Sequence, residues 1–125
     1  MNKIKCIIVD DEEDICEILG IYLTNINAFD LSYANSGNEA IRLIENNKPD
    51  LIICDYKMSN GNGGDVYSHL LKNNINIKYV LCSSDKPTQH EIFNDTRYLF
   101  GSIQKPDLSK GLEFIFEKLQ ITSHQ

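Results

Sequence analysis

The chain has 125 residues and a mass of 14.3 kDa, with a formal net charge of −6 and a pI near 4.9. This length suits a single domain over residues 1–125, which can bury about two thirds of its unfolded surface without disulfides or metals. The acidic charge argues against nucleic-acid or anionic-membrane binding by this domain, because phosphate groups are contacted mainly by Lys and Arg.

Two hydrophobic periods alternate along the chain. Continuous apolar runs are typical of parallel strands covered on both faces, and the segments between them have the 3.6-residue period of amphipathic helices. In chain order we expect strand 4–9, helix 15–26, strand 29–34, helix 36–44, strand 51–54, helix 66–71, strand 79–83, helix 87–97, strand 98–103 and helix 108–119.

The helix signals differ in strength. Ser36 is followed three residues later by Glu39, which is the pattern of a capping box at a helix start. The fourth helix is the weakest prediction: Pro87 suits a first turn, but the following TQHEIFNDTR is short and poor in helix formers. Five repeats of strand and helix imply right-handed crossovers and an α/β fold with a doubly wound five-stranded parallel sheet.

No apolar run approaches the roughly 20 residues that a membrane span needs. The start of the chain, MNKIKCIIVDDEED, also lacks the apolar core of a signal peptide, so we expect a cytoplasmic protein without membrane contact. The cysteines have no C-x-x-C spacing and lie in strand-like or helical runs. They are predicted to be buried, reduced thiols: Cys6, Cys16, Cys54 and Cys82.

Polar residues follow four of the predicted strands where each strand ends. Asp10 and Asp11 follow the first strand and Asp55 follows the third. Ser83 ends the fourth, and Lys105 comes shortly after the fifth. In doubly wound sheets ligands bind outside the carboxyl ends of the strands. Three acids, a hydroxyl and a lysine are therefore expected to converge on one edge of the sheet.

This combination indicates phosphoryl chemistry. Three carboxylates in one pocket repel each other, and a divalent cation relieves the repulsion. Few acidic ligands with room for water favour Mg²⁺ over a dedicated calcium cage. A lysine and a hydroxyl beside a metal suit the oxygens of a transferred phosphoryl group. An aspartate can itself attack phosphorus to give an acyl phosphate.

Each residue taken alone has a simpler interpretation. An Asp before a turn, such as Asp55, is usually a cap, and Asp10 and Asp11 suit the start of a helix, whose dipole favours acids. Lys105 alone fits an ordinary solvated lysine. GNGG lacks the lysine of a phosphate-binding loop and is interpreted as a turn into the third helix. The histidines lie near no motif in the sequence and are interpreted as surface residues: His69, His90 and His124.

Four motifs, VDDEED, LIICDYKMSNGNGGDVY, VLCSSD and QKP, resemble the receiver domains of two-component response regulators, in order and at appropriate spacing. The resemblance covers the full chain. It implies a flavodoxin-like (βα)5 fold with strand order 2-1-3-4-5 and a signalling module that is not an enzyme. The alternative function is a pseudo-receiver, a protein-interaction module that keeps the fold without phosphorylation.

By position, the resemblance makes Asp55 the phosphoacceptor and a ligand of Mg²⁺. Asp11 would bind Mg²⁺ directly, and Asp10 mainly through water or by supporting its neighbour. Lys57 would contribute only its backbone carbonyl to the metal, and its side chain would border the site. These roles are implied by the family, and the residues alone do not establish them.

The phosphoryl oxygens would be bound by Ser83 and by Lys105, which precedes an expected cis peptide bond to Pro106. One position departs from the family pattern: the usual switch aromatic, three residues before the lysine, is here Ser102. Phe100, one strand period earlier, is a candidate replacement.

The resemblance also implies partners. The phosphodonor would be a sensor histidine kinase or a histidine phosphotransfer protein. The output would be a downstream protein or an attached output domain, reached through the fourth helix, fifth strand and fifth helix, a surface that also suits a homodimer. The exposed position expected for Phe114 fits such contacts. Because the chain ends shortly after its last helix, we expect either a stand-alone receiver or one excised from a longer regulator.

Overall fold

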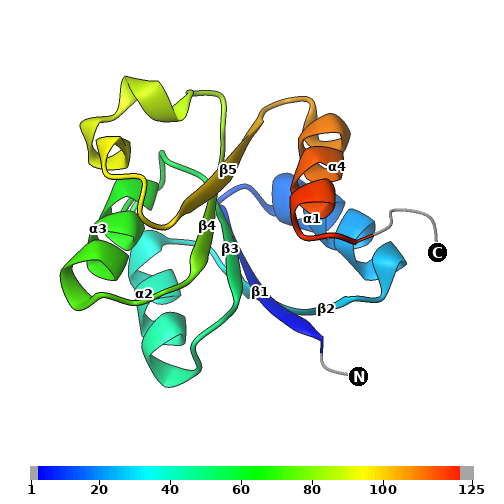
Figure 1. Cartoon of the computed structure of the whole chain (residues 1–125), viewed down its shortest axis with the longest axis horizontal. Coiled ribbons are helices and arrows are strands. Elements are labelled where there is room, and N and C mark those ends of the chain that lie inside the picture. Colours follow the sequence, from blue (N-terminus) through cyan, green and yellow to red (C-terminus); the bar gives the residue numbers. More distant parts are fainter. Residues whose placement is uncertain (1–2, 122–125) are drawn as a thin grey trace.

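The computed structural model describes residues 3–121 (Figure 1). The strands are β1 (Ile4–Val9), β2 (Phe29–Ala34), β3 (Leu51–Cys54), β4 (Lys78–Ser83) and β5 (Leu99–Gln104). The α-helices are α1 (Glu13–Ile26), α2 (Gly37–Asn46), α3 (Gly63–Asn73) and α4 (Leu108–Lys118), and two short 3₁₀ turns are η1 (Pro87–Gln89) and η2 (Glu91–Asn94).

The five strands form one parallel sheet in the order β2-β1-β3-β4-β5, as predicted. Helices α1 and α4 cover one face of the sheet, and α2 and α3 cover the other (Figure 1). Along β1, Cys6 and Ile8 face the first pair of helices, whereas Ile7 and Val9 face the second. Burial on both faces explains why the strands read as continuous apolar runs.

The predicted Ser36 cap of the second helix is confirmed, but the bond to the Glu39 side chain comes from Asn35 instead of Ser36, so the capping box is incomplete. The Glu39 backbone N–H donates to Ser36 Oγ at 3.1 Å, and the Asn35 N–H donates to Glu39 Oε1 at 2.8 Å. These two bonds satisfy backbone donors at the start of α2 that no helical carbonyl can reach.

We expect Ser36→Ala to lower the free energy of unfolding by about 1 kcal/mol, because it removes the acceptor at the start of α2. Urea denaturation measures the change. Ser109→Ala, at an exposed serine of α4, is the matched control and should change stability by less than about 0.5 kcal/mol. Equal effects of the two variants would contradict a capping role for Ser36.

The prediction of a fourth helix is wrong, because this stretch forms η1 and η2 instead of an α-helix. The sequence is poor in helix formers, so tertiary contacts decide its path. Phe93 is buried, with its ring 5.0 Å from that of Tyr67 and 5.7 Å from that of Tyr79. The Tyr67 hydroxyl donates to the carbonyl of Asp95, which holds the end of the segment against α3.

All four cysteines are free thiols, as predicted. The predicted burial is confirmed for three of them, whereas Cys16 is only half-buried. Burial raises the pKa of Cys16 to about 11 and that of Cys82 to about 12, so both remain protonated near neutral pH. Within residues 3–121, none of the helices has the length and apolar character that crossing a bilayer requires.

Candidate functional site

The carboxyl ends of β1, β3, β4 and β5 are neighbours in the sheet, and each has at least one predicted site residue at its end. Asp10 and Asp55 follow β1 and β3 directly, Ser83 is the last residue of β4, and Lys105 follows β5. Backbone bonds continue the ladder by one residue: Asp55 N–H donates to the Val9 carbonyl at 2.9 Å and Lys105 N–H to the Ser83 carbonyl at 3.0 Å. The sheet therefore fixes the backbone from which the four side chains extend.

Three carboxylates form the floor of the site. Asp10 and Asp55 are buried, at 2% and 7% exposure, whereas Asp11 is exposed. One oxygen from each lies within 4.8 Å of the others. Asp10 Oδ1 accepts from the Glu12 N–H at 2.9 Å, and Asp55 Oδ1 accepts from the Tyr56 N–H at 2.8 Å. Each buried carboxylate thus keeps Oδ2 for the pocket.

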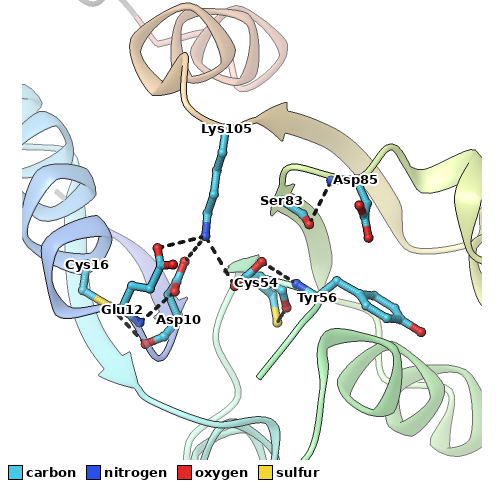
Figure 2. A network of polar contacts seen from close by, with 9 residues as sticks. Asp10, Glu12, Cys16, Cys54, Tyr56, Ser83, Asp85 and Lys105 are labelled. Carbon is cyan, nitrogen blue, oxygen red and sulfur yellow. Dashed lines mark hydrogen bonds and ion pairs between the residues drawn. The ribbon is translucent and has the colours of Figure 1, made fainter. Parts of the chain in front are cut away.

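Lys105 brings a cation to these oxygens (Figure 2). Its Nζ lies 2.9 Å from Asp10 Oδ2 and 3.3 Å from Asp55 Oδ2, with Glu12 Oε2 at 3.7 Å on the exposed rim. The peptide bond from Lys105 to Pro106 is cis, as expected from the sequence. One ammonium group therefore faces both buried carboxylates.

The pKa values of the buried carboxylates and of Lys105 are all raised. Burial raises the pKa of Asp10, and burial together with the charge of Asp10 raises that of Asp55. Burial alone would lower the pKa of Lys105, but its hydrogen bond and charge interactions with Asp10 and the charge of Asp55 outweigh that effect and raise it. One lysine is thus not enough to offset the cost of burial, and the charged forms of both carboxylates stay disfavoured.

The donor set fits a hard divalent cation. Three carboxylate oxygens converge, and carboxylates are the ligands that Mg²⁺ takes from proteins alongside water. Asp10 Oδ2 is buried, and among the described residues it has no hydrogen-bond partner apart from the ammonium of Lys105 at 2.9 Å, which also faces Asp55. An added positive charge would therefore stabilise carboxylates that share a single ammonium group.

The two remaining predicted site residues are Ser83, which ends β4, and Lys57, which follows β3. Ser83 is 2% exposed, and its Oγ accepts from the Asp85 N–H at 3.2 Å. Lys57 lies in the loop between β3 and α3 with its side chain exposed. The structure therefore brings Ser83 to the common edge, and the metal-binding role of the Lys57 carbonyl stays a prediction.

The sequence analysis missed His90, which it placed on the surface away from any motif. The side chain is only 19% exposed, its Nε2 lies 3.0 Å from Asp85 Oδ2, and its ring stacks on Tyr56. No local signal marks this, because Tyr56 lies 34 positions away in sequence. His69 is also half-buried, 3.6 Å from Glu45, and His124 lies outside the described residues.

The structure shows where Ser102, which stands at the position of the usual switch aromatic, and its candidate replacement Phe100 lie on β5. Ser102 is exposed on β5, and Phe100 is half-buried against the cluster under α1 and α4. Lys118 Nζ lies 4.5 Å from the centroid of the Phe100 ring and donates to the Phe100 carbonyl. Phe114 on α4 is 59% exposed, beside a groove of about 640 Å³ between β5 and α4.

Comparisons with known proteins agree with this geometry. The family model described as the response regulator receiver domain matches residues 6–115. The alkaline phosphatase synthesis transcriptional regulatory protein PhoP of Bacillus subtilis is 36% identical over 84 residues, which cover 67% of this chain and 34% of that protein. The chain spans less than half the length of the curated relatives it matches.

Solved structures share the fold. The signal receiver domain of a Luxo repressor protein from Vibrio parahaemolyticus superimposes with a TM-score of 0.82 at 20% identity, covering 95% of this chain and 92% of that one. The response regulator protein TrrA from Thermotoga maritima has a TM-score of 0.80 at 23% identity, covering 94% and 99%. The family match spans most of the chain, and the fold and strand-end residues agree with it, so the chain belongs to the response regulator receiver domains of two-component systems.

Proposed function

We propose that this receiver, with residues 1–125 as one domain, accepts a phosphoryl group on Asp55 and thereby changes its output surface. The observation that carries the proposal is the contact of Lys105 Nζ with both buried carboxylates, 2.9 Å from Asp10 Oδ2 and 3.3 Å from Asp55 Oδ2. A rigid strand end thus holds a nucleophile beside a cation, which is the arrangement that phosphoryl transfer requires.

In the proposed step the Asp55 carboxylate attacks phosphorus of a phosphohistidine on the donor. A new O–P bond forms, the N–P bond breaks, and its electron pair returns to the imidazole, which keeps or takes up a proton as the neutral leaving group. Lys105 turns from the carboxylates to the phosphoryl oxygens, and the Ser83 hydroxyl donates to one of them. The product is an acyl phosphate on Asp55.

Asp10, Asp11 and Asp55, with the backbone carbonyl of Lys57, are proposed to hold Mg²⁺. The ion would supply positive charge against the phosphoryl oxygens. The TrrA structure, which shares the fold, is of a complex with Mg(2+)-BeF, and this supports the proposal that a protein of this fold can hold the ion. The raised pKa values of Asp10 and Asp55 also support it, because burial disfavours their charged forms and a cation would offset that cost.

The phosphoryl group adds about −1.5 to −2 charge units at the end of β3. Drawing Ser83 and Lys105 towards it pulls on β4 and β5, and this biases the surface made by the η1–η2 segment, β5 and α4. A shift of that surface from mostly off to mostly on takes about 5 kcal/mol of differential stabilisation. A few charge-assisted hydrogen bonds supply that amount.

The partners follow from the family. The receiver is proposed to act in the cytoplasm, with a sensor histidine kinase or a histidine phosphotransfer protein as its phosphodonor. The η1–η2, β5 and α4 surface, with exposed Phe114 beside the groove, is proposed to contact a downstream protein, an attached output domain or a second receiver in a homodimer.

Incubation with phosphoramidate or acetyl phosphate and Mg²⁺ is expected to add the mass of one phosphoryl group, measured by intact-protein mass spectrometry. Asp55→Asn should abolish the added mass, because an amide cannot form the acyl phosphate. Asp95→Asn, outside the pocket, is the matched control and should be phosphorylated normally. An unchanged mass for the wild type, with no affinity for Mg²⁺, would instead favour a pseudo-receiver that acts only by binding proteins.

A further inference from the structure

A stacked pair of rings joins the two loops that border the pocket. The centroids of Tyr56 and His90 lie 3.6 Å apart, and the rings are within 13° of parallel. Tyr56 follows Asp55 directly, and its N–H donates to Asp55 Oδ1 at 2.8 Å. The stack therefore starts one residue from the proposed phosphoacceptor.

The same imidazole also holds the loop after β4. His90 Nε2 lies 3.0 Å from Asp85 Oδ2, with side-chain exposures of 19% and 18%. The Asp85 N–H in turn donates to Ser83 Oγ. In Figure 2 the Asp85 carboxylate lies on the Tyr56 side of Ser83, away from Lys105. His90 is thus linked through one residue on each side to Asp55 and to Ser83.

Packing alone does not account for a histidine at this position. The ring lies 6.4 Å from that of Phe93 and belongs to the edge of an aromatic cluster, which a phenylalanine would extend equally well. A phenylalanine would, however, leave the half-buried carboxylate of Asp85 without its partner, and burying such a group without one is costly. The imidazole meets both requirements, because its face stacks while its Nε2 binds Asp85.

We propose that His90 is a positioning residue for the phosphorylation of Asp55, which fixes the Ser83 hydroxyl relative to the Asp55 carboxylate. The inference rests on the proposed function of Asp55. Ser83 ends β4 and Asp55 follows the neighbouring β3, but among the described residues no backbone hydrogen bond joins the loops that lead from them to η1 and α3. The Tyr56–His90–Asp85 contact joins these loops through side chains.

The test is the rate at which phosphoramidate with Mg²⁺ phosphorylates each variant, followed by intact mass. His90→Ala should be phosphorylated about threefold to tenfold more slowly than the wild type, because small misplacements of a reacting group lower the rate steeply. His69→Ala is the matched control: His69 is 17% exposed and pairs with Glu45 between α2 and α3. Its rate should stay within about twofold of the wild type.

Two further variants separate positioning from packing. His90→Phe keeps the stack and loses the contact with Asp85, whereas His90→Gln keeps a donor for Asp85 and loses the ring. We expect His90→Phe to remain slow and His90→Gln to recover part of the rate. In an Asp85→Ala background, His90→Phe should cause little further slowing, because the contact it removes is already absent.

The outcomes are distinct for the two proposals. A wild type that takes no phosphoryl group contradicts the function of Asp55 itself. A wild type that is phosphorylated, with His90→Ala or His90→Phe at the wild-type rate, overturns the role of His90 alone. Equal slowing by His69→Ala, or effects of His90→Phe and Asp85→Ala that simply add, would also overturn it, because His90 would then act only on general stability.

Discussion

Replacing Lys105 with methionine is expected to lower the free energy of unfolding of the Mg²⁺-free receiver by about 2–4 kcal/mol. Lys105 is the cation that contacts both Asp10 and Asp55, and its side chain is 14% exposed. Methionine keeps much of the apolar stem but leaves two buried carboxylates without a positive partner. Urea denaturation in a chelator at neutral pH measures the loss.

Lys110→Met is the matched control, because Lys110 is an exposed lysine of α4. The same change of charge at that position should alter the free energy of unfolding by less than about 0.5 kcal/mol. If both variants lost the same stability, the loss would come from net charge and not from the contacts of Lys105 in the pocket.

The deficit of Lys105→Met should shrink as the pH falls. Burial raises the pKa of Asp10 and Asp55, so the folded protein binds these protons at higher pH than the unfolded chain. Such groups favour the folded state below the raised pKa, and this contribution is lost as the pH rises through it. Lys105 lowers both pKa values, so without it Asp10 and Asp55 become protonated at still higher pH. Once they are protonated they no longer need a positive partner, and the stability lost with Lys105 is partly regained. A deficit that did not change with pH would indicate lost packing instead.

The sequence predicts the convergence of the site because it depends on strand ends alone. Continuous apolar runs such as LIIC indicate parallel strands, and parallel strands place Asp10, Asp55 and Ser83 at one edge. The sequence does not predict the pairing of Lys105 with two carboxylates, nor burial as the main cause of their raised pKa values. Both depend on side-chain directions and burial, which sequence spacing leaves open.

Two errors of the sequence analysis lie in the segment after β4. A helix was predicted after Pro87, but the buried Phe93 sets the path of the chain against Tyr67 and Tyr79, and two 3₁₀ turns result. His90 was predicted to lie at the surface because its partner Tyr56 is far away in sequence, and no local pattern indicates their contact. Tertiary contacts override weak local propensity here, and a single sequence carries no periodic signal for such contacts.

Replacing Asp55 with asparagine should have the opposite effect on stability to the loss of Lys105. The pKa of Asp55 is raised, chiefly by burial and then by the charge of Asp10, so its ionised form is disfavoured in the folded protein. An amide of the same shape carries no charge, and we expect the Mg²⁺-free variant to be more stable than the wild type by about 1 kcal/mol at neutral pH. Asp30→Asn, at an exposed acid of β2, is the control and should be nearly neutral.

Adding Mg²⁺ should reverse the order of stability. An ion that binds only the folded state stabilises it by about 2.7 kcal/mol at a hundred times its dissociation constant, and the wild type is expected to gain this amount. Asp55→Asn lacks one of the three converging carboxylates and should gain less than half as much at the same concentration, while Asp30→Asn should follow the wild type. Urea denaturation with and without Mg²⁺ gives both differences. Equal stabilisation of Asp55→Asn and the wild type would place the ion away from Asp55, because the acid that is proposed to bind it would then be dispensable.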